Sequence, residues 1–268
     1  MRNSLRAALI AAAVAALVTI PGLGSGTLWD NSETAYGEVA REILLTHDWV
    51  VMHLNAFPWF VQPPLYFWIA ALLAKIFGIT TFALRLPAAL ATIVMGGLTA
   101  YAVTRQAGLR AGLYAGVILS TSLMQAIVGR LAIMDALLDL TVAFTIFWWF
   151  RSLQTGRDKY VMLGWASAAL GFLAKGPVAP VISLLVIAVY FFWERRATNA
   201  RLPSWKAWAA GVLVFAAIIA PWLIALIAAK GSHSMVRLIG HYTIGRYTGT
   251  IENQSGPVWY YLPVLILG

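Results

Sequence analysis

Residues 65–79 are Leu-Tyr-Phe-Trp-Ile-Ala-Ala-Leu-Leu-Ala-Lys-Ile-Phe-Gly-Ile, and they decide the topology of the whole chain. The segment is apolar, but it is short and contains Lys75, whereas a helix that crosses a bilayer needs about 20 apolar residues. If it does not cross, 11 of the 19 Lys and Arg residues fall on one side of the membrane in short segments. If it crosses, nine of those eleven move to the opposite side, against the cytoplasmic bias of basic residues. We therefore predict a half-inserted helix that returns to the side from which it came.

The eleven basic residues of that count lie at the ends of other apolar segments, and they are Arg2, Arg6, Arg105, Arg110, Arg151, Arg157, Lys159, Arg195, Arg196, Arg201 and Lys206. The positive-inside bias places them in the cytoplasm, together with the N-terminus. The other side then receives a first outer loop of about residues 25–80, residues 130–135, residues 175–176 and a last outer loop of about residues 230–257. We predict that the reactive residues gather on this extracytoplasmic face.

Composition places the chain in a membrane. Hydrophobic residues make up 61% of the 268 positions and charged residues 11%, with a mean hydropathy of +0.79, so no polar shell could cover a soluble core. We attribute the net charge of +9 to basic residues that orient the helices in the membrane, and we expect no nucleic-acid partner. The chain has no cysteine, which excludes disulfides and thiolate metal sites. Further apolar segments occupy residues 5–23, 86–104, 111–129, 136–150, 160–174, 178–193, 208–229 and 259–268.

These segments predict an all-α, polytopic membrane protein that crosses the bilayer about eight times, as a single domain over residues 1–268. A cleaved signal peptide is the alternative for the first segment, but no clear Ala-x-Ala site follows it and more spans do. The last segment stops at Gly268 after ten residues, too few to cross about 30 Å of hydrocarbon at about 1.5 Å per residue. We expect a C-terminally truncated chain or one half of a split protein, which would need a second chain as partner.

Residues 28–43 of the first outer loop predict a turn followed by an amphipathic helix at the membrane surface. Val39, Ile43 and Leu44 form an apolar stripe. Glu38, Arg41 and Glu42 are predicted to face away from it. Further on, residues 57–68 are rich in aromatic side chains and proline, which is typical of the headgroup level.

Two carboxylates near the start of that helix, Asp30 and Glu33, form a pair that could serve as a general base or bind a charged substrate. The alternative is helix capping, with Asp30, Asn31 or Ser32 accepting backbone hydrogen bonds and Glu33 favoured by the positive helix end. Both interpretations remain open at this point.

The later outer segments each carry isolated charges. Arg130 and Asp135 flank a turn and either pair across it or contact a substrate. Lys175 lies in a hairpin between two apolar segments, where it either snorkels to the surface or binds a lipid phosphate. Asp139 lies one turn inside the membrane, and the last loop carries His241 and Arg246, whose spacing does not by itself indicate a metal site.

Taken in order, five motifs resemble those of the GT-C glycosyltransferases that use polyprenyl-phosphate sugars, in particular the aminoarabinose transferase and protein O-mannosyltransferase branch. The family patterns are D-E-x-x-Y-x-E-x-A-R-E, K-P-P-L-Y-x-W, G-R-L-x-x-x-D-A-L-L, F-L-x-K-G-P and P-x-W-Y-Y. Their counterparts here are residues 32–42, 62–68, 129–138, 172–177 and 241–261, the last of which includes a loop with histidine and arginine before P-x-W-Y-Y. The resemblance covers nearly the whole chain, and the motifs are specific only as a set.

This resemblance implies a cell inner membrane enzyme that moves a hexose or pentose from a polyprenyl-phosphate donor to an envelope acceptor, a lipid or glycan rather than a protein. It implies an inverting reaction with no obligatory metal or cofactor. It also implies that membrane lipids are partners of the enzyme. A first-loop carboxylate would act as base and cations would steady the departing phosphate. The resulting prediction has Glu33, Asp30 and Asp135 as catalytic residues; substrate-binding residues would be Tyr36, Gln62, Arg130, Lys175, His241, Arg246 and Tyr260.

Three positions depart from the family pattern. Ser32 replaces the catalytic aspartate, Ala35 stands where an arginine is common, and Gln62 replaces a lysine. Serine does not act as a general base here, so we expect Glu33 or Asp30 to take that role, with Glu33 preferred. The competing interpretation is a non-catalytic protein, either a transporter or flippase for lipid-linked sugars or a degenerate relative, although no internal repeat typical of transporters is evident.

Overall fold

The computed structural model describes residues 2–29, 31–194 and 203–231. The long elements are all helices, and the strands form one small hairpin in the first loop. In chain order the elements are α1 (Arg2–Thr19), α2 (Asn31–Thr46), β1 (His53–Leu54), β2 (Phe57–Pro58), α3 (Leu65–Phe77), α4 (Thr81–Ala107), α5 (Leu109–Thr121), α6 (Leu123–Val128), α7 (Asp135–Thr155), α8 (Asp158–Lys175), α9 (Val178–Glu194) and α10 (Trp205–Lys230).

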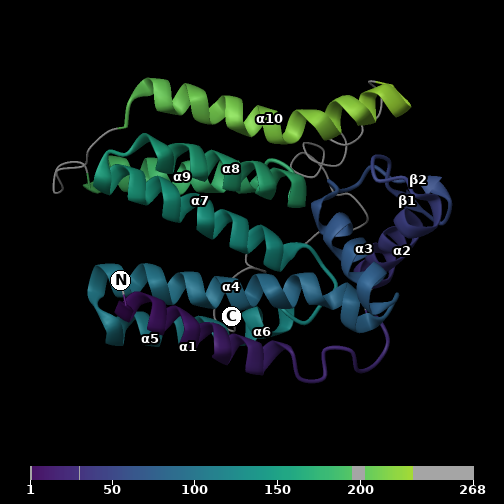
Figure 1. The fold of residues 1–268 in the computed structure, drawn as a ribbon, viewed down its shortest axis with the longest axis horizontal. Helices are drawn as coiled ribbons and strands as arrows, with labels where there is room; N and C mark the ends of the chain where they lie inside the picture. Colours follow the sequence, from purple (N-terminus) through teal and green to yellow (C-terminus); the bar gives the residue numbers. More distant parts are fainter. Residues whose placement is uncertain (1, 30, 195–202, 232–268) are drawn as a thin grey trace, which may run out of the picture.

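The long helices form a layered bundle, with α1 and α5 against α4, α7 between α4 and α8, and α10 on the outer side of α8 (Figure 1). α1, α4, α7 and α10 are each long and apolar enough to span a membrane. The bundle turns large apolar side chains outward, as Leu17, Ile118 and Leu213 show. An outer surface of this kind is stable against lipid rather than water. The prediction of an all-α polytopic membrane protein is confirmed.

Small residues let α1, α4 and α5 approach closely. Ala7, Ala11 and Ala15 of α1 are fully buried, four residues apart on one face. A Cβ atom added at Gly116 of α5 would collide with the side chains of Ala11 and Ala100. Small side chains at such contacts are typical of membrane helices, whose association depends on close packing because lipid tails are as apolar as leucine.

The short helix α3 lies at one end of the bundle beside α2 and the first turns of α4 (Figure 1). Its 13 residues extend about 20 Å, less than the thickness of the hydrocarbon core. The start of α4 contacts the segment that follows α1, where the Thr81 hydroxyl donates to the Gly26 carbonyl at 3.3 Å. The first loop therefore starts and finishes at the same end of the bundle (Figure 1). The half-inserted position of segment 65–79 in a membrane stays a prediction.

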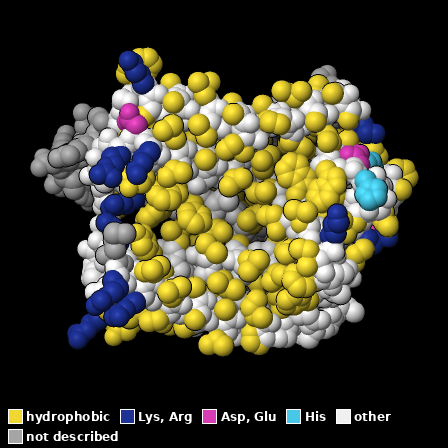
Figure 2. Space-filling model, viewed as in Figure 1, with side chains coloured by type: hydrophobic (Ala, Val, Ile, Leu, Met, Phe, Trp, Pro, Cys, Tyr) yellow, Lys and Arg dark blue, Asp and Glu magenta, His cyan; other side chains and the backbone are white. Residues whose placement is uncertain are grey.

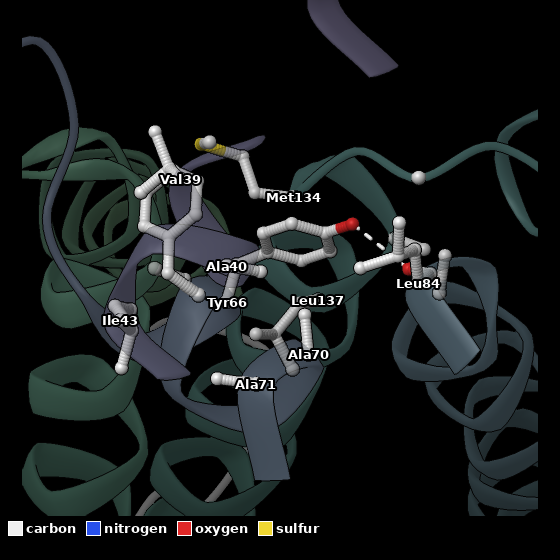
Figure 3. Close-up of a cluster of buried hydrophobic side chains, with 14 of the residues drawn as sticks. Val39, Ala40, Ile43, Tyr66, Ala70, Ala71, Leu84, Met134 and Leu137 are labelled. Atoms are coloured by element: carbon white, nitrogen blue, oxygen red, sulfur yellow. Dashed lines mark hydrogen bonds between the residues drawn. The ribbon is translucent and has the colours of Figure 1, made fainter. Parts of the chain in front are cut away.

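A buried apolar core holds this loop against the bundle (Figure 3). Val39 and Ile43 of α2 pack there with Tyr66 of α3 and Leu137 of α7. The Tyr66 hydroxyl donates to the Leu84 carbonyl at 2.9 Å, so the phenol is satisfied without water. Four segments that are distant in sequence are thereby fixed relative to one another.

In the amphipathic helix α2, one of the three charged residues predicted to face outward is buried instead. Glu38 and Arg41 face outward, as expected, and they pair with each other at 2.7 Å. Glu42 was predicted to face outward as well, and this is wrong: it is buried, with Oε1 accepting from the Ala56 amide at 2.8 Å. The turn between β1 and β2 folds back over α2 and covers Glu42, which the helical pattern alone does not indicate.

Other boundaries also shift. The predicted segment 111–129 is two helices, α5 and α6, separated at Ser122, whose backbone is extended. The predicted last segment from Trp259 onward lies outside the described residues.

The opposite end of the bundle is basic (Figure 2). α4, α5, α7 and α8 each begin or end there, and the described Lys and Arg residues at this end are Arg2, Arg6, Arg105, Arg110, Arg151, Arg157, Lys159 and Lys206. The bundle thus has a basic end and an end that carries the first loop.

Candidate active site

Glu33 and Arg85 form a buried ion pair at the loop end of the bundle. Glu33 is in the first turn of α2 and is fully buried, and Arg85 is in the second turn of α4 and is 8% exposed. The contact is bidentate, with Nε to Oε1 and Nη2 to Oε2 both at 2.9 Å. Two parallel hydrogen bonds of this kind fix the orientation of both groups.

Every polar position of this pair is occupied. Besides Arg85, Glu33 accepts the Trp29 amide on Oε2 at 2.8 Å and the Ala132 amide on Oε1 at 2.6 Å. A carboxylate has about four acceptor positions, and all four are used. The remaining donors of Arg85 reach the carbonyl oxygens of the segment that follows α1, at Leu23, Ser25 and Thr27.

Burial alone would raise the pKa of Glu33, because desolvation disfavours the charged form. The Arg85 guanidinium and the amides of Trp29 and Ala132 outweigh burial and hold the pKa below its usual value. Glu33 is therefore ionised at neutral pH. A general base needs an accessible lone pair, and in this structure Glu33 presents none.

Hydrogen bonds at two positions hold the segment between α6 and α7 in place. Its middle is bound through the Ala132 amide to Glu33. Its start is bound through Arg130, whose Nη1 donates to the carbonyls of Val18 and Thr19 at 3.0 and 3.1 Å. These are C-terminal carbonyls of α1, where a cation is favoured by the helix dipole. The alternative in which Arg130 pairs with Asp135 across the turn is wrong.

Asp135, the first residue of α7, pairs instead with Lys175, the last residue of α8. The aspartate side chain is 38% exposed and the lysine side chain 28% exposed. Lys175 therefore does not simply snorkel, because its ammonium is held by a carboxylate from the neighbouring helix. This pair is accessible, whereas the Glu33 pair is not.

Close to the Asp135–Lys175 pair in the chain, the first loop packs against α8 and α10. Trp222 of α10 donates from its indole N–H to the Val50 carbonyl at 3.0 Å. Val51, Leu173 and Trp222 pack in one buried cluster. Since Leu173 is two residues before Lys175, this cluster connects the first loop to the helix end that carries the ammonium group.

Two predicted substrate-binding residues lie in the first loop and its core. Tyr36 packs edge-on against Trp59 and Phe67, with ring centroids 6.0 and 5.5 Å apart. Gln62 is buried just before α3. Both lie at the loop end of the bundle.

Four predicted site residues, Asp30, His241, Arg246 and Tyr260, lie outside the described residues. Within residues 2–29, 31–194 and 203–231, no three His, Asp or Glu side chains are grouped as metal ligands.

Sequence reasoning missed Arg85, the partner that determines the environment of Glu33. A signal was present, because Arg85 lies in an otherwise apolar helix, and ionisable residues in membrane helices usually have a specific partner. The partner could not be named from the sequence because Glu33 is 52 positions away.

The fold and this end-of-bundle arrangement of charges define a polytopic helical membrane protein with its polar groups gathered at one end. The family model of dolichyl-phosphate-mannose-protein mannosyltransferases matches residues 61–224. The chain belongs to that family, which confirms the GT-C assignment.

Curated relatives carry a more specific name. The chain is 30% identical to the undecaprenyl phosphate-alpha-4-amino-4-deoxy-L-arabinose arabinosyl transferase of Edwardsiella ictaluri, over 94% of this chain and 45% of the relative. It is 31% identical to the protein of the same name from Aeromonas salmonicida, over 90% of this chain and 44% of the relative. The chain thus spans about half the length of the curated relatives it matches.

A solved structure shares the fold. The crystal structure of ArnT from Cupriavidus metallidurans bound to undecaprenyl phosphate matches with a TM-score of 0.84 and 26% identity, over 96% of this chain and 47% of that one. The apo structure of the same protein matches with a TM-score of 0.81 and 24% identity.

Proposed function

We propose that this chain takes part in transferring a sugar from a polyprenyl-phosphate donor to an envelope acceptor, a lipid or a glycan. The names of the curated relatives and the undecaprenyl phosphate bound in the similar crystal structure support this donor class. The observation that carries the proposal is the accessible Asp135–Lys175 pair, which joins a potential base to a potential phosphate contact.

In the proposed reaction, the donor phosphate draws the Lys175 ammonium away from Asp135 and leaves that carboxylate able to accept a proton. Asp135 takes the proton of the acceptor hydroxyl as its oxygen attacks the anomeric carbon. The bond from that carbon to the phosphate oxygen breaks, and the electron pair leaves with polyprenyl phosphate. Lys175 steadies the charge on the departing phosphate. Asp30 is retained as a second candidate base, and no metal enters these steps.

Glu33 is proposed as a positioning residue instead of the base. Its four hydrogen bonds join α2, α4 and the segment that precedes Asp135. Through the Ala132 amide, three residues before Asp135, it sets the position from which α7 begins. Arg85 has the same role, because it binds the segment after α1 to the same carboxylate.

The sidedness proposed for the site follows from the charge distribution. Basic residues gather at the end of the bundle opposite the first loop, and basic segments favour the cytoplasm (Figure 2). The N-terminus would then be cytoplasmic, and the Asp135–Lys175 pair would face the extracytoplasmic side of the inner membrane.

A transfer assay tests the proposed function. The full chain in proteoliposomes would receive a radiolabelled undecaprenyl-phosphate aminoarabinose donor and lipid A as acceptor, and the label in the acceptor would be counted. Wild type is expected to transfer label, and Lys175→Gln is expected to raise KM for the donor by about 10- to 100-fold, since one charged phosphate contact contributes about 1.5–3 kcal/mol. Label that crosses the bilayer while still on its carrier would instead favour the transporter alternative.

A further inference from the structure

A pocket lies between α4 and α7 near the basic end of the bundle, far along both helices from the candidate active site. Its volume is about 170 Å³. Ala102, Val103 and Arg105 of α4 line it, together with Phe147, Phe150 and Arg151 of α7. Drug-sized ligands occupy about 300–1,000 Å³, so this pocket suits a segment of a chain rather than a whole compact ligand.

The order of these residues along the helices gives the pocket a direction. α4 runs toward the basic end, so Ala102 and Val103 lie deeper in the bundle than Arg105. α7 runs the same way, so Phe147 lies deeper than Arg151. The apolar part of the pocket therefore lies deeper in the bundle, and the two arginines lie nearer its basic end, which is the order of acyl chain and headgroup in a phospholipid of that leaflet.

Both arginines keep donors available. Arg105 reaches the Tyr101 hydroxyl at 3.5 Å, and Arg151 donates to the Gln154 side chain at 2.9 Å. Each guanidinium also lies over a tyrosine ring, 5.9 Å from the centroids of Tyr101 and Tyr160 respectively, and these contacts leave further N–H groups of both arginines unused. In the part of the chain that the structure describes, neither guanidinium forms an ion pair with a carboxylate. The positive-inside bias accounts for basic residues at this end, but it does not require two of them to flank one apolar pocket.

We propose that this pocket binds an anionic glycerophospholipid of the cytoplasmic leaflet, with the phosphate between Arg105 and Arg151 and the upper part of an acyl chain against Phe147 and Val103. Basic pockets between helices on this side of membrane proteins recognise anionic headgroups in this way. The site is separate from sugar transfer, and only its assignment to the cytoplasmic leaflet rests on the sidedness proposed above.

Native mass spectrometry of the purified chain tests the site, with dioleoyl phosphatidylglycerol and dioleoyl phosphatidylcholine offered at equal concentration. Wild type should retain phosphatidylglycerol in preference. Each arginine at the surface should contribute about fivefold, so Arg105→Gln with Arg151→Gln should weaken retention by roughly thirtyfold. The matched control is Arg110→Gln with Arg157→Gln, which removes two exposed arginines from the same end that do not line the pocket.

The control pair should keep the preference for phosphatidylglycerol, and an equal loss there would overturn the proposal in favour of diffuse attraction. Val103→Trp keeps the charge but fills the pocket, so it should also release the lipid, and unchanged retention would overturn the site. Undecaprenyl phosphate is a third arm: if it displaces phosphatidylglycerol at lower concentration from wild type, the assignment to a glycerophospholipid is wrong. Unfolding midpoints of all variants would establish that each is folded.

Discussion

Glu33–Arg85 and Asp135–Lys175, two carboxylate–cation pairs at the loop end of the bundle, differ in burial and are suited to different tasks. Glu33 and Arg85 are buried, bidentate and bound on all sides by backbone groups. Asp135 and Lys175 lie at two helix ends, more than a quarter exposed, with a single contact. A buried charge without its partner is costly, whereas an exposed pair is readily exchanged for another ligand. The first pair is thus suited to holding structure and the second to chemistry.

The largest expected effect is on turnover. Asp135→Asn keeps the shape of the side chain but removes the base, so kcat should fall by about 10²–10⁴-fold in the transfer assay. The unfolding midpoint in detergent should stay within a few degrees of wild type, because the lost pair is partly exposed to solvent. Wild-type turnover in Asp135→Asn would show that Asp135 is not the base and would favour Asp30 in that role.

A large effect on stability is expected at the buried pair. Arg85→Met leaves the Glu33 carboxylate buried without its cation, which should cost about 3–5 kcal/mol in the free energy of unfolding. Denaturant unfolding followed by tryptophan fluorescence would measure it. Arg110→Met, which removes an exposed arginine, is the control and should change little. A loss no larger than that of the control would contradict the structural role of the pair.

Acid should weaken the buried pair through Glu33. Its pKa is lower in the folded chain than the usual 4.5, so its contribution to stability is complete above about pH 4.5 and is lost as the pH falls through the folded pKa. Unfolding midpoints of wild type should therefore drop below pH 4.5 more steeply than those of Glu33→Gln. Parallel curves for the two proteins would exclude Glu33 as the source of this dependence.

The smallest effect is expected on the outer face of α2. Glu38 pairs with Arg41 at the surface, three residues away on the same helix. Glu38→Gln should leave both the unfolding midpoint and the transfer rate unchanged, because such pairs are screened by solvent. A clear loss of activity would show that this face contacts the substrate.

Most of the long helices could be predicted from the sequence, because long apolar segments with basic residues at their ends are typical of helices that span a membrane. Lys75 and the shortness of residues 65–79 pointed to a short helix, and α3 is 13 residues long; its return to the same side of the membrane stays a prediction. The pairing of side chains was not predictable in the same way. Arg130, Asp135 and Lys175 each had a plausible local role, and their true partners lie 40 or more residues away.

Glu33 shows the same limit more sharply. Its position beside the helix start and next to the altered Ser32 made it the preferred base, since a sequence shows residue type and spacing but not which lone pairs are occupied. That preference depended on an accessible carboxylate. Arg85 and the Ala132 amide, 52 and 99 positions away, remove that accessibility.

The most direct test measures turnover and unfolding midpoint together on the same preparations of Glu33→Gln and Asp135→Asn. The account predicts an inactive Asp135→Asn with a wild-type midpoint and a Glu33→Gln whose midpoint is clearly lowered. An inactive Glu33→Gln with a wild-type midpoint, together with an active Asp135→Asn, would contradict it and return the role of base to Glu33.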